Sequence, residues 1–507
     1  MKYLCSIFAA VTMAIGMPVA ASGAPTYWAY SYKGIDVTGL DSADGAKSIA
    51  HKLHRLDMAI TNVMSANSSQ WRPATHVYLL SEATYARVRG KKDDSPSQFS
   101  SNSFGNTILI AKPVSGDSTL WATYYGFTGS VLVSAYSFRY PRWFISGISE
   151  VFAASSMSGA DVTIGSFNPG RVQTLLKSRL IPVRTLLELH GGDSQLQSRD
   201  FAELYDAESW FLVHLIVIEG KYQSNFDRYF QMLDRGESES RAFAGSFDIS
   251  YEDLDKLLQV TLRSRKIYTY KVAIPDEKDG LAPTRLTDAE AAGRLAALAA
   301  RMSPLPDDAL QMANDAIRLD PTNQDALFAL AHVQIRRTDY SEGFQAGDRL
   351  CTQNSLTQAS MAECGQLFSS LSAAVSEKKA VVAVDALPLA ERSRQYYEKA
   401  IAMDSDDLEP WDGLANLLAR IRNSEYTQAF LPRAQQALSA HPRNAEFARA
   451  LAGLNASTGS YVSALNYATM WQTAALDEGS RDAATAYIAR LKAEMERSTL
   501  RNAAKSP

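Results

Sequence analysis

Histidines are the side chains most able to hold a catalytic metal, and this chain of 507 residues has seven of them. His51 and His54 are three residues apart, a spacing that places both on one face of a helix and that a zinc site can use. No glutamate or third histidine follows nearby, so we interpret the pair as surface or half-buried histidines. His214 lies in the apolar run 210–218, which predicts a core histidine bonded to backbone. His190 precedes two glycines and is interpreted as a turn residue.

A second candidate for catalysis is the segment 140–153, which reads Tyr-Pro-Arg-Trp-Phe-Ile-Ser-Gly-Ile-Ser-Glu-Val-Phe-Ala. Its serines do not form the Gly-x-Ser-x-Gly turn of a serine hydrolase. The segment resembles P-x-W-x-x-E-G-x-A-E of the gluzincin metallopeptidases, in particular the peptidase MA-like family. The first glutamate of that pattern is the third zinc ligand, and Ser146 stands in its place. The retained frame consists of Pro141, Trp143, Gly147, Glu150 and Phe152.

The resemblance also locates the zinc-binding helix, which carries HExxH in the family. The family spacing puts this motif on residues 125–129, where the two histidine positions are Tyr125 and Gly129 and the general base is Gly126. Catalytic zinc requires three protein ligands and a bound water whose proton a glutamate removes. A change of register restores no ligand, because residues 77–189 contain no histidine. The resemblance therefore implies a peptidase-like domain without its zinc chemistry.

Two features of this former site leave alternatives open. Glu150 supports the metal site indirectly in the related enzymes, and here it is expected to cap a helix or to pair with Arg139 or Arg142. Aromatic side chains also crowd the former catalytic helix, and they either fill the space left by metal and water or line a cleft that holds a peptide without cutting it. These aromatic residues are Trp121, Tyr124, Tyr125 and Phe127.

The elements that must position these residues belong to a predicted α+β unit over residues 25–270. Apolar periodicity predicts its strands and helices, and a polar, serine-rich loop is expected over 91–105. A helix over 205–220 and the segment 242–262 resemble further landmarks of the same family. The predicted strands are 26–37, 76–81, 106–111 and 162–167, and the predicted helices are 43–64, 120–135 and 142–154.

The second half of the chain is helical and repetitive. After a polar linker at 271–285, residues 286–500 resemble tetratricopeptide repeats, in which small residues let paired helices pack closely. Related turns read Asp-Pro-Thr-Asn at 320–323 and His-Pro-Arg-Asn at 441–444. Three or four repeats are expected, irregular near 355–390. Such repeats stack into an all-α solenoid with a concave groove.

Composition restricts the cellular setting. The net charge of −4 gives no reason to expect nucleic acid or an anionic membrane as a partner. Residues 1–24 have the charge and apolar pattern of a secretory signal, which would remove Cys5 and deliver the chain to a periplasm without an integral membrane segment. Cys351 and Cys364 then remain, either as a disulfide or as buried thiols.

These observations predict a protein that binds rather than cuts. The sequence favours an exported scaffold that receives a protein or peptide partner in the solenoid groove, with no cofactor and no catalytic activity. The alternative is a zinc-dependent peptidase or other hydrolase with unrecognised ligands, for which His51, His54, His190 and His214 are the remaining candidates. A third hypothesis is an assembly protein that associates with itself through the solenoid.

Overall fold

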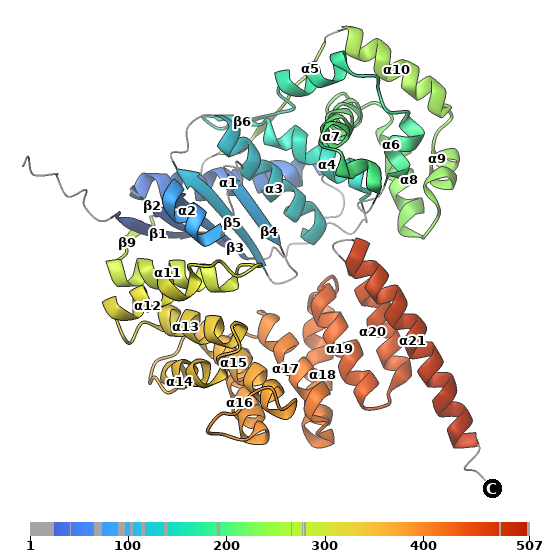
Figure 1. Cartoon of the computed structure of the whole chain (residues 1–507). Coiled ribbons are helices and arrows are strands. Elements are labelled where there is room, and N and C mark those ends of the chain that lie inside the picture. Colours follow the sequence, from blue (N-terminus) through green and yellow to red (C-terminus); the bar gives the residue numbers. More distant parts are fainter. Residues whose placement is uncertain are drawn as a thin grey trace, which may run out of the picture.

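The computed structural model shows a front α+β unit followed by an arc of paired helices (Figure 1). The predicted signal 1–24 and His190 lie outside the residues that the structure describes. The described residues are 25–40, 42–64, 74–89, 97–101, 105–112, 117–135, 140–189, 193–264, 266–275, 277, 280–475 and 478–503.

A six-stranded mixed sheet is the centre of the front unit. Its strands are, in spatial order, β4 (Ser97–Ser101), β5 (Gly105–Lys112), β3 (Ala74–Ser81), β2 (Ile35–Leu40), β1 (Tyr27–Tyr32) and β9 (Thr284–Arg285). Strands β2, β3 and β5 are parallel, while β1, β4 and β9 pair antiparallel with their neighbours.

Two predictions for this sheet were wrong. The single strand expected over 26–37 is the hairpin β1–β2, because Lys33 and Gly34 both adopt positive φ and turn the chain. The loop expected over 91–105 contains β4, in which Phe99 pairs with Ile108 of β5. The serine-rich composition of this segment indicated a loop. The segment forms a strand instead because it pairs with β5 at the edge of the sheet.

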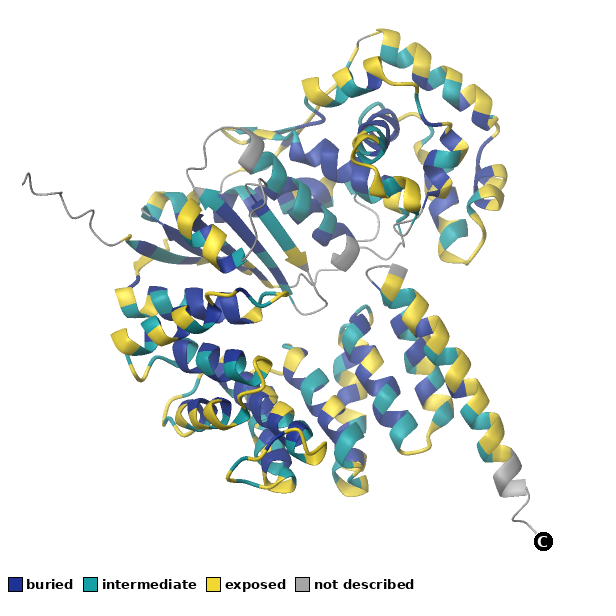
Figure 2. Ribbon diagram, viewed as in Figure 1, coloured by how far each residue is buried: buried dark blue, intermediate teal, exposed yellow. Residues whose placement is uncertain are grey.

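Both faces of the sheet are covered, which makes three layers (Figure 2). Val77 and Leu79 contact the core on one face, with helices α1 (Ala43–Met64), α3 (Asp117–Ala135) and α4 (Arg142–Ala153). Leu80 and Leu109 belong to the core on the other face, with α2 (Glu82–Arg89) and α11 (Asp288–Arg301). Because α11 is the first helix of the solenoid, the front unit and the solenoid share one hydrophobic core.

A helical lobe and a small sheet complete the front unit. The lobe contains α5 (Pro169–Lys177), α6 (Val183–Glu188), α7 (Arg199–Val213), α8 (Gln223–Asp234), α9 (Glu239–Ser246) and α10 (Tyr251–Ser264). The small sheet has the order β6 (Ser156–Ser158), β7 (Asp161–Ile164) and β8 (Tyr270–Ala273).

The segment predicted as a free linker, 271–285, returns to both sheets. Strand β8 pairs with β7, and β9 pairs with β1 through Trp28 opposite Arg285. The polar composition of this segment was mistaken for an absence of structure, because edge strands tolerate polar side chains on their exposed side.

The solenoid consists of antiparallel helix pairs in which each first helix also contacts the first helix of the next pair. Thus α11 contacts α13, α13 contacts α15, α15 contacts α17 and α17 contacts α19, which is the packing of tetratricopeptide-type repeats. At the two predicted turns, Asn323 and Asn444 cap α13 and α19. The helices are α12 (Ala309–Leu319), α13 (Gln324–Arg336), α14 (Tyr340–Cys351), α15 (Gln358–Ser376), α16 (Ala386–Met403), α17 (Glu409–Ile421), α18 (Ser424–Ala440), α19 (Ala445–Ser457), α20 (Tyr461–Ala474) and α21 (Glu478–Ala503).

Across the described part of the chain, every helix is too short or too polar to cross a lipid bilayer.

Candidate functional site

The first candidate is the crossing of α3 and α4, which carries the positions that the resemblance assigned to a zinc site. The hydroxyl of Tyr125 on α3 lies 3.3 Å from Oγ of Ser146 on α4. Ser146 in turn donates a 2.6 Å hydrogen bond to Oδ1 of Asp206 on α7. Because the Ser146 proton is used in that bond, Tyr125 is the donor to Ser146. Tyr125 and Ser146, which come from different helices, therefore meet at this crossing.

Glu150 lies one turn further along α4 and is fully buried. Its partner is Arg171 at the start of α5, whose guanidinium donates to Oε1 and also lies 3.9 Å from Asp206. Burial raises the pKa of Glu150 to about 7, although Arg171 acts in the opposite direction. Oε2 has no hydrogen-bond partner among the described residues, which agrees with this raised pKa.

The expected partners of Glu150 were different. Arg139 lies outside the described residues, and Arg142 lies instead 5.8 Å from the ring centroid of Tyr205. Arg171 and Asp206 were missed because they are 21 and 60 residues from their partners. Asp206 gave no clear local signal, because α7 also carries Asp200, Glu203 and Glu208.

Phe99 occupies the space beside Gly126, the position of the general base in the resemblance. A Cβ atom added to Gly126 would lie 2.7 Å from Cβ of Phe99 on β4. A glutamate therefore does not fit there unless β4 moves. At the other end of the motif, a Cβ on Gly129 would lie 3.5 Å from Oγ of Ser149, in ordinary contact. The edge strand β4 thus covers α3 at the position that the resemblance assigns to the general base.

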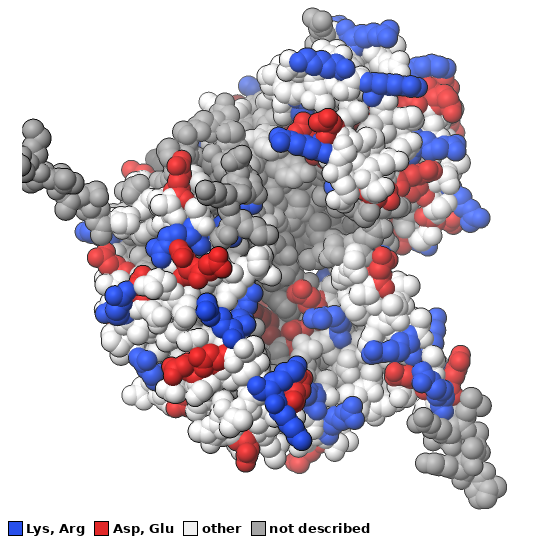
Figure 3. All heavy atoms as spheres, viewed as in Figure 1, with Lys and Arg blue, Asp and Glu red and all other residues white. Residues whose placement is uncertain are grey.

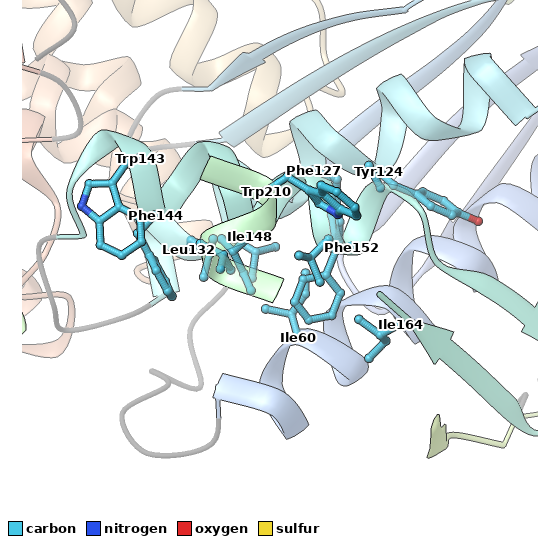
Figure 4. Close-up of a cluster of buried hydrophobic side chains, with 14 of the residues drawn as sticks. Ile60, Tyr124, Phe127, Leu132, Trp143, Phe144, Ile148, Phe152, Ile164 and Trp210 are labelled. Atoms are coloured by element: carbon cyan, nitrogen blue, oxygen red, sulfur yellow. The ribbon is translucent and has the colours of Figure 1, made fainter. Parts of the chain in front are cut away.

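Aromatic packing continues around this crossing. Burial raises the pKa of Tyr125 to about 12, so its hydroxyl remains protonated. Tyr124 and Phe127 on α3 and Trp210 on α7 all belong to the buried core around this crossing (Figure 4). Of the two interpretations of the aromatic residues, this packing favours the one in which they fill space.

The described histidines are held by neighbours other than a metal. His51 is buried, contrary to the surface or half-buried position expected, because its ring stacks on Tyr32 with centroids 4.3 Å apart. The Tyr30 hydroxyl lies 2.9 Å from its Nε2 atom. His54 packs edge-on against Tyr32.

His214 is a core residue bonded to backbone, as predicted. Its Nε2 atom lies 2.9 Å from the carbonyl oxygen of Tyr268 and 3.3 Å from that of Gly165. Burial lowers the pKa of His214. Within the described ranges, no three His, Cys, Asp or Glu side chains converge closely enough to bind a metal ion.

The second candidate is the inner face of the solenoid, the surface formed by α11, α13, α15, α17 and α19. Arg301 at the end of α11 forms an ion pair with Glu363 on α15 and lies 4.4 Å from the ring centroid of Phe328 on α13. The electrostatic influence of Tyr78 from the sheet and Glu409 from α17 also reaches Arg301. Figure 3 shows acidic and basic atoms inside the hollow between the front unit and the solenoid. One continuous surface therefore joins the sheet to successive repeats.

Tyr397 on α16 reaches this inner face through a slot between two glycines. A Cβ on Gly365 of α15 would lie 2.6 Å from Cδ1 of Tyr397, and a Cβ on Gly413 of α17 would lie 2.5 Å from its hydroxyl oxygen. Only 5% of Tyr397 is exposed. Its hydroxyl makes no hydrogen bond with any described residue. Burial raises the pKa of Tyr397, and the nearby carboxylates of Asp412 and Glu409 raise it further.

Asp412 lies beside this hydroxyl on α17. Its Oδ2 atom accepts a 3.0 Å hydrogen bond from the Asn416 amide, whereas Oδ1 is buried and has no partner among the described residues. Burial raises the pKa of Asp412 to about 7; Arg449 opposes this change, and Glu446 and Glu409 add to it. The side chain of Glu409 is exposed to solvent on the inner face of the solenoid. The protein around it nevertheless removes part of its hydration, and this raises the pKa of Glu409.

Sequence reasoning used Tyr397 only as a repeat landmark and did not single out Gly365, Gly413 or Asp412. The sequence did contain one sign of this slot, which is a glycine, Gly413, inside a predicted helix. An interior glycine lowers the stability of a helix, so its presence indicates close packing against another side chain.

Cys351 and Cys364 join α14 to α15 through a disulfide with a Cα–Cα distance of 5.8 Å.

No family model and no curated protein matches this chain. Among solved structures, one match is the crystal structure of YrrB, described as "a TPR protein with an unusual peptide-binding site". The match has 17% sequence identity and a TM-score of 0.27, and it covers 39% of this chain and 92% of that chain. Because this TM-score is low, the match carries no argument. The repeats are assigned from the helix packing described above.

Proposed function

We propose that this protein is a non-catalytic scaffold that binds a protein or peptide on the inner face of its solenoid. The observation that carries the proposal is the continuity of this face. Arg301, Glu363 and Glu409 come from three different repeats yet act on one another, and Tyr78 extends the surface onto the sheet. A surface built from successive repeats suits an extended chain, which contacts one repeat after another.

The proposed role of the front unit is to support this groove. Two observations support a non-catalytic interpretation of the α3–α4 crossing: Arg171 is neutralised by carboxylates within the crossing, and Phe99 fills the space beside Gly126. The relation to peptidase MA-like proteins remains part of the proposal and depends on the sequence frame around Trp143 and Gly147.

Export to the periplasm is also proposed. The signal-like start of the chain supports it, and so does the disulfide between Cys351 and Cys364, since disulfides persist in oxidising compartments.

Selection of a random heptapeptide library on the immobilised full chain tests the binding function. We expect enrichment of a shared motif, and we expect its affinity to fall when Arg301 and Glu363 are both replaced by Ala. A library that shows no enrichment over a blank surface would contradict the proposal. The matched control is the double substitution of Arg199 and Glu203, an exposed ion pair on α7 in the front unit.

Metal analysis of the same preparation tests the competing function. The scaffold proposal predicts less than stoichiometric zinc and no cleavage of casein. Stoichiometric zinc that a chelator removes, together with casein cleavage lost on removal, would establish the peptidase instead.

A further inference from the structure

We propose that the inner face between α15 and α19 recognises a cationic side chain, lysine or arginine, of the bound peptide. The acceptors are the carboxylates of Asp412 and Glu409 and the hydroxyl of Tyr397. This inference rests on the scaffold function proposed above and adds the chemistry of the ligand.

The charge on this part of the groove is the first support. Carboxylates from two repeats influence one another here, since Glu409 on α17 and Glu446 on α19 both raise the pKa of Asp412. Arg301 is engaged by Glu363. Arg449 acts on Asp412 and Arg420 acts on Tyr397, so two cations face the three carboxylates of Asp412, Glu409 and Glu446. A positive charge from outside would relieve this repulsion.

Unused hydrogen-bonding capacity is the second and independent support. Oδ1 of Asp412 is buried without a partner, and the Tyr397 hydroxyl has none among the described residues, although 95% of the residue is buried (5% exposed). Buried polar atoms are nearly always paired in folded proteins, so the unpaired Oδ1 atom of Asp412 needs an explanation. A donor supplied by a ligand would satisfy it, and the Tyr397 hydroxyl, which Asp412 influences, offers a second acceptor.

The glycine slot is shaped around the ring and the hydroxyl of Tyr397. Gly365 and Gly413 stand within α15 and α17, where glycine is less favourable than alanine. Their missing side chains let the Tyr397 ring pass between the helices and bring its hydroxyl to Asp412 and Glu409. A shorter apolar residue would fill the space without requiring two glycines.

The spacing of the acidic groups points to an organic cation. A metal ion needs several ligands within about 2.0–2.6 Å, and no such group of three exists in the part of the chain that the structure describes. A guanidinium or ammonium group presents donors in several directions and can join acceptors that are further apart.

The experiment extends the library selection on the full chain. We expect lysine or arginine to be enriched at one position of the selected heptapeptides. Replacing that residue by glutamine in the synthetic peptide should weaken binding at least about tenfold, since each tenfold step is about 1.4 kcal/mol and a charge-assisted hydrogen bond is of this order. Asp412→Asn in the protein should weaken the basic peptide to a similar extent and leave the glutamine peptide unchanged.

Further variants separate binding from folding. Tyr397→Phe removes only the hydroxyl and should weaken the basic peptide about threefold or more. Glu409→Gln alters an exposed side chain and repeats the charge test without affecting the core. The matched control is Glu425→Gln on α18, an exposed acidic residue for which no change in affinity is expected. Melting temperature confirms that each variant is folded.

The outcomes distinguish the two proposals. A selected motif without lysine or arginine, or one insensitive to both Asp412→Asn and Glu409→Gln, would overturn this inference while leaving the scaffold function intact. A library without any enrichment would overturn both. Spermidine is the test for a free polyamine: if it binds to the wild type as tightly as the peptide and loses affinity in Asp412→Asn, the cation site is real but its ligand is not a peptide.

Discussion

The α3–α4 crossing and the α15–α17 slot are built in similar ways but differ in how their carboxylates are paired with cations. In both, a helix glycine receives an aromatic side chain, which is Phe99 at Gly126 and Tyr397 at Gly413. At the crossing, Glu150 pairs with Arg171 and Asp206 accepts from Ser146, so both carboxylates have a partner within the fold, although Oε2 of Glu150 has none. At the slot, the Tyr397 hydroxyl and Oδ1 of Asp412 have no partner among the described residues.

This difference separates a closed site, whose carboxylates have partners within the fold, from an open site, where Asp412 forms no ion pair with a described residue. A closed site should lose stability when its polar or packing residues change, because each of them is used by the fold. An open site should lose little stability, because its unpaired groups weaken the free protein and are useful only to a ligand. Stability measurements can therefore test the comparison without knowledge of the partner.

The largest effect is expected at Gly147, where α4 passes closest to α7. A Cβ at this position would collide with the backbone carbonyl of Ser209, which cannot rotate away. Gly147→Ala should lower the free energy of unfolding by about 3 kcal/mol in denaturant titration. Gly453→Ala on α19 is the control, since open space surrounds Gly453, and it should be neutral or stabilising by about 0.5–1 kcal/mol. Equal stability of the two variants would contradict tight closure of the α4–α7 interface.

A pH effect is expected from Glu208, a fully buried residue on α7 next to the crossing. Burial raises its pKa to about 8, although the backbone N–H of Ile181 donates to it. The folded state therefore favours the protonated form. This contribution to stability is complete below the ordinary pKa near 4.5 and is lost as the pH rises through about 8.

Glu208→Gln removes this titration. Between pH 5.5 and 8.5, the wild type should lose on the order of 2 kcal/mol more than the variant, as followed by urea unfolding at each pH. If the free energy of unfolding changes with pH in the same way in both proteins, the pKa of Glu208 is not raised by folding, and the prediction is wrong.

The slot can be tested by a double-mutant cycle. Gly413→Ala should cost about 1–2 kcal/mol in the wild type, because the new methyl group meets the ring of Tyr397. In a Tyr397→Leu background the same change should cost nothing or stabilise the helix, since leucine does not reach Gly413. If the effects of the two substitutions on the free energy of unfolding are additive, Gly413 and Tyr397 do not depend on each other, and the slot interpretation is wrong.

The smallest effects compare the two sites directly. Ser146→Ala should destabilise the protein by about 1 kcal/mol, because Asp206 loses a hydrogen bond inside the fold. Asp412→Asn should melt at the wild-type temperature or slightly above, because a partly buried charge with acidic neighbours is removed. Calorimetry gives the melting temperature of both variants. If Asp412→Asn is destabilised and Ser146→Ala is not, the assignment of the closed and the open site is wrong.

Local patterns predicted much of the fold. Helices α1, α3 and α4 begin and end close to the expected residues because apolar spacing and flanking prolines are local signals. Strand β4 was missed because its stability comes from pairing with β5, and the β1–β2 turn was missed because Lys33 is an unusual residue at positive φ.

The two sites differed in how far the sequence could predict them. Counting along the chain brought Tyr125 and Ser146 together, because both positions were fixed by one helix crossing. Phe99, Arg171 and Asp206 depend on packing between distant segments, which a single sequence does not reveal. The slot residues were hidden for a similar reason: Gly365, Tyr397 and Gly413 are interpretable only when three helices are seen together.

The sheet face that packs against α11 has a consequence for biosynthesis. Leu80 and Leu109 contact a hydrophobic core that Leu295 and Ala299 complete, so the N-terminal strands emerge from the ribosome long before the helix that shields them. A nascent chain that ends before Asp288 would expose this apolar face of the sheet, and exposed apolar surface promotes aggregation. Holdase chaperones should accordingly bind truncated chains that end before α11 and release those that extend beyond it.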